Sequence, residues 1–177
     1  MSLDGYIADR NGQFDWAEPT RTVHEYINEL ERPFGTYLYG RRMYEVMAYW
    51  ELDELTSDDD SVISEYARIW RGADKIVFSR SLRHVDSART SLQSRFDPSD
   101  ISALKATSDR PVSIGGATLA SVAFAAGLVD RFSAIVVPVT VGSGTAALPR
   151  DQRHDFVLLS DRRIDEGVVH LDYRVTT

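Results

Sequence analysis

The sequence contains no cysteine, which excludes disulfides, thiolate catalysis and zinc or iron–sulfur sites built on cysteine. Basic residues are outnumbered: Lys plus Arg is 20 against 27 for Asp plus Glu, and the formal net charge is -7 at pH 7. Nucleic acids and membrane surfaces are polyanions, so this balance argues against both as partners. No apolar run approaches ~18 residues, and the first residues lack the basic and apolar regions of a signal peptide. We expect a cytoplasmic protein.

Several common catalytic motifs are also missing. The chain has no G-x-S-x-G nucleophile elbow, no Walker-type phosphate loop and no H-E-x-x-H pair, which leaves the common hydrolase and NTPase chemistries unsupported. The histidines are scattered without the spacing of metal ligands, and we expect surface or structural positions for them and no metal site: His24, His84, His154 and His170.

What remains is the composition of one globular domain. The 177 residues are 43% hydrophobic and 27% charged, and they contain no repeat, low-complexity tract or Pro/Ser-rich linker. We therefore expect a single domain over residues 1–177.

Segments with helical and with strand patterns alternate along the chain. Apolar spacing predicts helices over 21–32, 43–49, 62–70, 98–105 and 118–126, and strands over 36–39, 75–78, 112–114, 132–141, 156–159 and 168–175. The acidic run Asp58–Asp60 suits the N-terminus of one helix, and Asp97 with Pro98 suits another. The turn-rich residues 161–167 would join the last two strands. This order predicts an α/β fold: a largely parallel sheet with crossover helices, finished by an antiparallel hairpin.

Glycines mark the end of one predicted strand. Gly115 and Gly116 stand between the strand 112–114 and a helix, so backbone N–H groups could approach an anion at a helix start, as in sites for dinucleotide pyrophosphates. The alternative is a tight turn in which glycine is merely tolerated, because no third glycine completes a G-x-G-x-x-G fingerprint.

Two further strand ends carry arginines. Gly40-Arg41-Arg42 follows the strand 36–39, and Ser79-Arg80-Ser81 follows the strand 75–78. Taken singly, each arginine is better explained as a solvated side chain than as a ligand contact. Together, the three strand ends favour a phosphorylated ligand, because ligands of open α/β sheets bind at the carboxyl ends of strands.

Three aromatic residues have two interpretations. Trp16, Tyr49 and Trp50 fit a hydrophobic core, and they could instead wall a flat heterocycle.

Five short motifs occur in a fixed order and carry a family resemblance. They are Ser2-Leu3-Asp4-Gly5-Tyr6-Ile7-Ala8, Gly40-Arg41-Arg42-Met43-Tyr44-Glu45, Ile114-Gly115-Gly116-Ala117, Gly127-Leu128-Val129-Asp130 and Pro138-Val139-Thr140-Val141-Gly142-Ser143-Gly144. Nearly the whole chain resembles the dihydrofolate-reductase-like superfamily, in particular the C-terminal reductase domain of the riboflavin-biosynthesis deaminase/reductase and its stand-alone bacterial relatives.

The resemblance implies a three-layer fold with a mixed, mainly parallel sheet, helices on both faces and a C-terminal antiparallel hairpin. It also implies NADPH across the strand ends. Gly115 and Gly116, joined by a cis peptide, would contact the pyrophosphate, with Ala117, Thr118 and Leu119 at the adjoining helix start. Gly40, Arg41 and Arg42 would hold phosphates, and Ser79 and Arg80 would meet the adenosine ribose and its 2′-phosphate. Asp4, Tyr6, Trp16 and Trp50 would face the substrate.

The chain departs from its relatives at three places. They carry a central strand before the Ser2-Leu3-Asp4-Gly5 motif, with which this sequence begins. Met43 stands where dihydrofolate reductases proper have a threonine, and a thioether cannot donate that hydroxyl's hydrogen bond. The stretch 20–30 offers only Glu25 and Glu29, without a motif to align them, for the carboxylate that anchors a pterin.

The function expected from this resemblance is an NADPH-dependent reductase of a small heterocyclic or carbonyl substrate, similar to the riboflavin-pathway reductase. Asp4 would orient the substrate or assist proton delivery, or else only form a turn with Gly5. The alternatives are a nucleotide-binding protein without turnover and, ranked lowest, a true dihydrofolate reductase. A homodimer is implied by the relatives; the apolar run 134–137 could contribute to it, although a buried core strand explains that run equally well.

Overall fold

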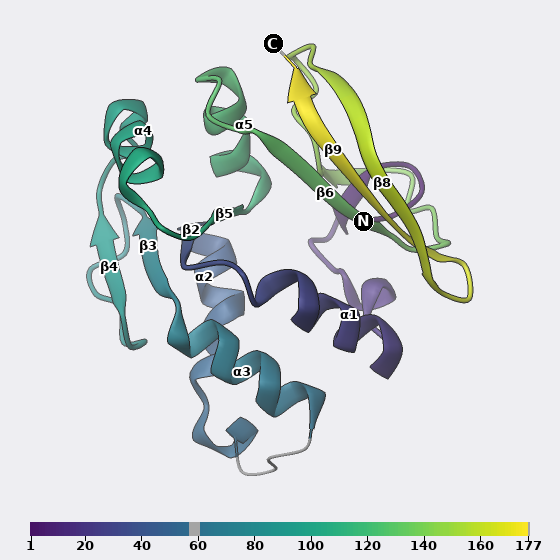
Figure 1. The fold of residues 1–177 in the computed structure, drawn as a ribbon, viewed down its shortest axis with the longest axis horizontal. Helices are drawn as coiled ribbons and strands as arrows, with labels where there is room; N and C mark the ends of the chain where they lie inside the picture. Colours follow the sequence, from purple (N-terminus) through teal and green to yellow (C-terminus); the bar gives the residue numbers. More distant parts are fainter. Residues whose placement is uncertain (57–60, 177) are drawn as a thin grey trace. The chain divides into compact units, whose positions relative to one another are not determined.

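The computed structural model describes residues 1–56 and 61–176, and Figure 1 shows its helices and strands. The chain divides into two compact units, one formed by Met1–Val23 with Ala120–Thr177 and the other by His24–Leu119. Helices α1 (Arg21–Glu31) and α5 (Ala117–Ala125) contain the points where the chain passes from one unit to the other. No described helix is long and apolar enough to cross a membrane.

A four-stranded parallel sheet forms the centre of the unit His24–Leu119. Its strand order is β4 (Thr90–Gln93), β3 (Asp74–Phe78), β2 (Thr36–Gly40) and β5 (Val112–Gly115). The consecutive residues Tyr37, Leu38 and Tyr39 of β2 are all 2–3% exposed, so both faces of this strand are covered. Continuous burial of this kind is typical of an inner strand of a parallel sheet.

The core of this unit is aromatic. Tyr37 and Tyr39 point to the same face of β2, and their rings stack at a centroid distance of 5.6 Å. Helix α3 (Val62–Gly72) contributes the fully buried Trp70, whose indole Nε1 donates to the Tyr39 hydroxyl over 3.3 Å. The helix begins at Ser61, whose side chain accepts from the Ser64 N–H over 3.0 Å. The acidic run 58–60 expected at this helix start lies outside the described residues.

The remaining helices of this unit follow their strands closely. Helix α2 (Arg41–Met47) begins directly after β2 and continues into the 3-10 turns η2 (Ala48–Glu51) and η3 (Asp53–Thr56). It starts two residues before the predicted helix, because Gly40 itself is the N-cap. Helix α4 (Pro98–Thr107) confirms the prediction of its start: the Asp97 carboxylate accepts from the Ser99 N–H over 3.0 Å, and Pro98 occupies the first turn.

The other unit is built on antiparallel strands. One sheet has the order β6 (Arg131–Val136), β9 (Val168–Thr176) and β8 (Asp155–Asp165). A second pairs β1 (Tyr6–Asp9) with β7 (Gly144–Ala146), and η1 (Asp15–Ala17) follows β1. Strands β1, β4 and β7 have three or four residues each and no strand pattern of their own, which is why the sequence did not predict them.

Two predicted boundaries in this unit are wrong. Strand β6 ends at Val136 and not at residue 141, because Pro138 lacks an N–H for a ladder and Val139 N–H bonds back to the Val137 carbonyl over 2.8 Å. The predicted turn 161–167 is mostly strand: β8 runs to Asp165, and the connection is Glu166 with Gly167, where glycine permits a φ of +74°. The α/β class, the parallel sheet and the C-terminal hairpin are confirmed.

Candidate functional site

The structure brings three of the predicted binding segments to one edge of the parallel sheet. Gly40 is the last residue of β2 and Gly115 the last of β5, while Ser79 follows the end of β3. The strand register pairs Gly40 with Phe78 and Tyr39 with Gly115. Because parallel strands end at the same edge, the backbones at 40, 79 and 116 lie next to one another, as the sequence predicts.

The glycine pair is required by its surroundings. A Cβ on Gly115 would lie 3.0 Å from Cδ1 and Cε1 of the Tyr39 ring, which is tighter than nine in ten real Cβ contacts. Gly116 has a φ of +98°, in the left-handed region that side chains rarely adopt. The expected cis peptide is wrong: none of the described peptide bonds is cis, and the positive φ of Gly116 turns the chain between β5 and α5. Both positions therefore select glycine.

Met43 packs against this glycine pair. Its Cγ would lie 3.2 Å from a Cβ on Gly115, and its Cβ 3.4 Å from a Cβ on Gly116. Met43, which stands where dihydrofolate reductases proper have a threonine, thus fills the space beneath the turn at residues 115 and 116. Its thioether offers no donor to a phosphate there.

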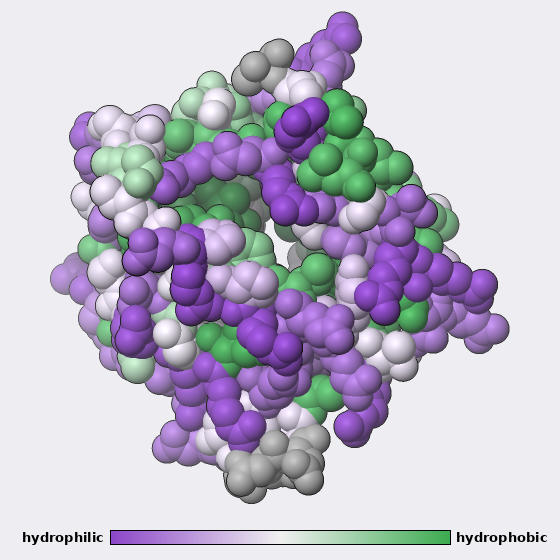
Figure 2. Space-filling model, in the orientation of Figure 1, coloured by the Kyte–Doolittle hydropathy of each residue, from purple (hydrophilic) through white to green (hydrophobic). Residues whose placement is uncertain are grey.

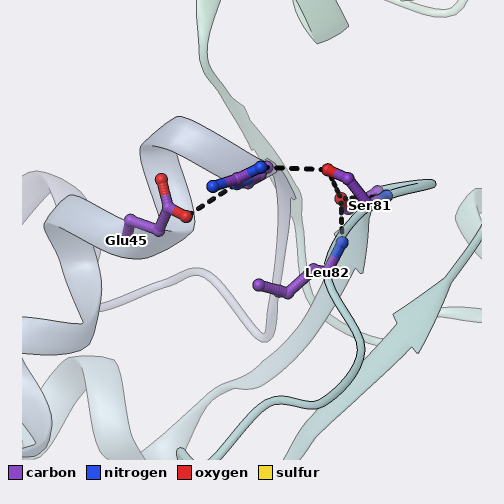
Figure 3. Close-up of polar contacts among 5 residues, drawn as sticks. Glu45, Ser81 and Leu82 are labelled. Carbon is purple, nitrogen blue, oxygen red and sulfur yellow. Dashed lines mark hydrogen bonds and ion pairs between the residues drawn. The ribbon is translucent and has the colours of Figure 1, made fainter.

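Arg41 is held in place by two partners, Glu45 and Ser81, which Figure 3 labels. Its Nε donates to Glu45 Oε1 over 2.7 Å, one turn further along α2, and its Nη1 donates to Ser81 Oγ over 3.0 Å. Ser79 Oγ in turn accepts from the N–H groups of Ser81 and Leu82 over 3.2 and 3.0 Å. The guanidinium therefore connects the start of α2 with the loop after β3 across the sheet edge.

Arg42 and Arg80 complete the basic character of this edge. Both side chains are exposed, and neither has a hydrogen-bond or ion-pair partner within residues 1–56 and 61–176. An unpaired guanidinium at a strand end retains all its donors for an anion. On a chain of net charge -7, such a local cluster is what a phosphorylated ligand needs to overcome the overall field.

The helix that follows the glycine pair begins one residue earlier than predicted. Helix α5 starts at Ala117, so Ala117 and the exposed Thr118 occupy its first turn. The Leu119 side chain is 9% exposed and would lie 3.8 Å from a Cβ on Gly40. That side chain packs beneath the end of β2 and leaves only the backbone of residue 119 for a ligand.

Asp4 belongs to the other unit and anchors a turn. Its carboxylate accepts from the Gly142 N–H over 2.7 Å and from the Val141 N–H over 3.2 Å. The Ser2 hydroxyl and then these backbone N–H groups lower the pKa of Asp4. The side chain is therefore ionised at neutral pH, which suits a hydrogen-bond acceptor and not a proton donor.

Tyr6 and Trp16 lie in the same unit as Asp4. Tyr6, on β1, is 8% exposed, and the Arg150 guanidinium lies 4.7 Å from its ring centroid. Trp16 lies in η1, where its Nε1 donates to the Gln13 carbonyl over 3.2 Å.

Trp50 belongs to the unit with the parallel sheet. It is half-buried, and its ring packs against Tyr66 at 4.5 Å and His24 at 5.9 Å between centroids. Tyr49 beside it is 51% exposed. Of the two interpretations, a position at the hydrophobic core fits Trp50 but does not fit the exposed Tyr49. The four predicted substrate residues are thus divided between the two units, each of which is described by itself.

The sequence analysis did not predict the roles of two residues that shape this edge of the sheet. Glu45 and Ser81 orient Arg41, and neither was assigned a role. The Glu45 contact has a signal in the sequence, because opposite charges four residues apart on a helix pair on its surface. The Ser81 contact has none, because residues 41 and 81 meet only through the parallel pairing of β2 with β3.

Comparison with known proteins defines the class to which this fold belongs. The family model of the RibD C-terminal domain matches residues 1–170. YyaP of Bacillus subtilis (strain 168) is 26% identical over 177 residues, covering 98% of this chain and 90% of YyaP. The chain belongs to the RibD C-terminal domain family.

Solved structures show the same fold. A "Putative riboflavin biosynthesis protein" of Shewanella sp. PV-4 superposes with a TM-score of 0.76 at 18% identity, over 100% of this chain and 96% of that one. Dihydrofolate reductase from Enterococcus faecalis, complexed with NADP(H), superposes with a TM-score of 0.63 at 13% identity, over 100% and 93%. The chain thus has a dihydrofolate-reductase-like fold.

Proposed function

We propose that this protein is an NADPH-dependent reductase of a small heterocyclic or carbonyl substrate, of the riboflavin-pathway type. The observation that carries the proposal is the sheet edge where Gly40-Arg41-Arg42, Ser79-Arg80 and Gly115-Gly116 meet. Membership of the RibD C-terminal domain family supports it independently of that edge.

The residues of this edge fit a dinucleotide. A turn without side chains at 115 and 116 leaves the backbone N–H groups open to a pyrophosphate, and the start of α5 adds a partial positive charge. Arg42 and Arg80 supply guanidinium groups whose planar donors match phosphate oxygens. We assign Arg80 and Ser79 to the ribose with its 2′-phosphate, and Gly40 with Arg41 and Arg42 to the other phosphates.

The bound dinucleotide would supply a hydride from C4 of its nicotinamide ring. The protein's contribution is to hold the coenzyme and place the acceptor carbon about 3–3.5 Å from that atom. We assign Tyr6, Trp16 and Trp50 to substrate contacts. Asp4 is assigned to orientation: an ionised carboxylate has about four acceptor positions, so it can accept from a substrate N–H or O–H besides its bonds to Val141 and Gly142.

Binding experiments test the coenzyme assignment without a known substrate. We expect NADPH to bind more tightly than NADH in isothermal titration calorimetry. Arg80→Gln should weaken NADPH binding about tenfold, equivalent to roughly 1.4 kcal/mol, and leave NADH binding unchanged. Arg153→Gln, which removes the same charge from an exposed site of the other unit, is the matched control. Absence of any NADPH binding would refute the proposal.

One observation favours a second function, a nucleotide-binding protein without turnover. The sequence analysis named Asp4 for substrate orientation or proton delivery, and its lowered pKa and its bonds to residues 141 and 142 describe a turn anchor that does not deliver a proton. The loss of reduced-coenzyme absorbance with a panel of pterins, pyrimidines and simple carbonyl compounds separates the two. Oxidation with any of them supports the reductase, and tight binding without oxidation across the panel supports the binding protein.

A further inference from the structure

His24 is a buried histidine to which neither the sheet edge nor the assigned substrate contacts give a role. It lies on α1 and is 8% exposed. Its ring makes edge contacts with Trp50, at 5.9 Å between centroids and 72° between planes, and with Tyr66, at 5.7 Å and 88°. A phenylalanine would fill the same space, so packing alone does not account for an imidazole beside Trp50, a residue that we assign to the substrate.

The fully buried Asn28 determines which nitrogen of the His24 ring carries a proton. Its Nδ2 donates over 2.9 Å to the Val62 carbonyl and over 2.9 Å to Glu65 Oε2, both on α3. A carbonyl oxygen can only accept, so the amide nitrogen must face α3, and the amide oxygen faces His24 Nδ1 at 3.2 Å. An amide oxygen also only accepts. Nδ1 therefore donates, and in the neutral ring Nε2 is left as an acceptor.

An ion pair between α1 and α3 holds the amide in this orientation. Glu65 accepts from Arg32 through Oε1 and from Asn28 through Oε2. These two hydrogen bonds, that of Asn28 first, lower the pKa of Glu65, so its carboxylate is ionised at neutral pH and only accepts. The side chains of Arg32 and Glu65 are 59% and 40% exposed, and Figure 2 shows mostly hydrophilic surface over α1 and α3. The chain of hydrogen bonds thus runs from the solvent to the buried imidazole.

The second ring nitrogen of His24 has no partner. Within residues 1–56 and 61–176, Nε2 makes no hydrogen bond. The side-chain polar atoms that are fully enclosed without a partner in that part of the chain are Tyr37 Oη and Glu51 Oε2. Nε2 is not one of them, so it reaches the solvent boundary. A fixed acceptor beside an aromatic ring is suited to an N–H or O–H donor of a flat ligand that packs on that ring.

We propose that His24 is a substrate-binding residue whose Nε2 accepts a hydrogen bond from an N–H group of a heterocycle lying against Trp50. The inference rests on the proposed function, since it takes Trp50 as a substrate contact. It narrows the substrate class to lactam and amino heterocycles, because a simple carbonyl compound offers no donor. A site built to bond a donor rejects the analogue that lacks it, since its own polar group is left unpaired. Asn28 acts through His24 and is a positioning residue.

The protonation of the ring can be measured without any ligand. Long-range proton–nitrogen NMR spectra of the ¹⁵N-labelled chain, at a pH where the imidazole is neutral, should show His24 protonated at Nδ1 and unprotonated at Nε2. His24→Phe identifies the signals by their loss. Asn28→Leu removes the acceptor of Nδ1, so the form protonated at Nε2 should appear in that variant. A wild-type His24 protonated at Nε2 would overturn the proposal.

Calorimetric titration with matched heterocycles tests the binding role. Uracil, lumazine and pterin are each compared with an N-methylated analogue, using the free chain and the chain saturated with NADP⁺. At least one parent compound should bind about tenfold more tightly than its analogue. His24→Phe should abolish this preference, whereas a steric effect of the methyl group would persist in that variant. His24→Gln, whose amide oxygen can accept, should keep part of it. His84→Phe removes an exposed imidazole of the same unit and is the matched control.

The same titrations distinguish this inference from the proposed function. Failure of the wild type to bind NADPH would refute the reductase, and the heterocycle preference of the free chain would still decide the role of His24. With coenzyme binding intact, equal affinities within all three pairs, or an undiminished preference in His24→Phe, would overturn the assignment of His24 alone. Near-ultraviolet circular dichroism checks each fold. If Asn28→Leu unfolds, the wild-type spectrum and His24→Phe decide without it.

Discussion

The Arg41 guanidinium donates to the Ser81 hydroxyl over 3.0 Å, and this bond joins two strand ends that lie forty residues apart in the chain. The same guanidinium donates to the Glu45 carboxylate over 2.7 Å (Figure 3). Arg41 is thus oriented before any ligand arrives, and one of its partners is an anion that a phosphate must displace or share. Among the residues that the structure describes, Arg42 and Arg80 have no such competitor.

Glu45→Gln should therefore increase the affinity for NADPH. An exposed helical ion pair is worth about 0.3–0.5 kcal/mol, so releasing Arg41 from the carboxylate should tighten binding roughly twofold. Ser81→Ala should do the opposite and weaken binding about fivefold, since a lost hydrogen bond costs about 1 kcal/mol and leaves Arg41 less well oriented. Titration calorimetry measures both. If Glu45→Gln weakened binding, the carboxylate would be a support for Arg41 and not a competitor.

Gly115→Ala should destabilise the protein and impair coenzyme binding together. Its methyl group would lie 3.0 Å from the Tyr39 ring, which is fixed by stacking on Tyr37, so the strand end must shift. Overpacking of this kind costs about 1–3 kcal/mol. Gly72→Ala is the matched control, because a methyl group there meets nothing within 4 Å. Urea denaturation measures the free energy of unfolding; equal values for the two variants would show that the edge tolerates a side chain.

Asp4→Asn should lower kcat/KM for an accepted substrate and leave NADPH affinity unchanged. The amide keeps one acceptor oxygen but sets a donor against the N–H groups of Val141 and Gly142. The pKa of Asp4 is lowered in the folded chain, so its stabilising bonds are present above its unfolded pKa of about 4 and are lost as the pH falls through the folded value. The difference in free energy of unfolding between wild type and Asp4→Asn should therefore decrease toward zero as the pH falls below about 4. Asp151→Asn, an exposed carboxylate of the same unit, serves as control.

Lys75→Met should change how stability depends on pH. The Lys75 side chain is 1% exposed, its Nζ donates to the carbonyls of Trp70 and Ala73 over 3.0 and 3.1 Å, and burial lowers its pKa to about 8. Between pH 8 and the unfolded pKa of about 10.4, Lys75 is more protonated in the unfolded chain than in the folded chain. This group therefore makes the free energy of unfolding of the wild type increase as the pH rises through this range.

The variant should lack that gain. Thermal melts between pH 7.5 and 9.5, roughly below the range in which tyrosines ionise in the unfolded chain, compare the two slopes. Parallel curves for wild type and Lys75→Met would show that the buried ammonium keeps its ordinary pKa.

The sequence by itself determined the elements that carry strong local patterns. Helices α1, α3 and α4 and the inner strands follow from apolar spacing and caps, because those forces act within a few residues. The glycines and arginines at three strand ends were predicted as one group from the rule for parallel sheets, and the structure brings them to one edge.

Only the tertiary structure decided the rest. Short strands such as β1 and β7 exist because a distant partner pairs with them, and β8 extends to Asp165 because β9 lies alongside it. Ser81 meets Arg41, and Met43 meets Gly115, through strand pairing between distant segments. Asp4 became a turn anchor because the N–H groups of residues 141 and 142 reach it across the unit. Such contacts form only when the fold brings distant segments together. The residues around a position in the sequence do not specify which segment a hundred residues away will lie beside it.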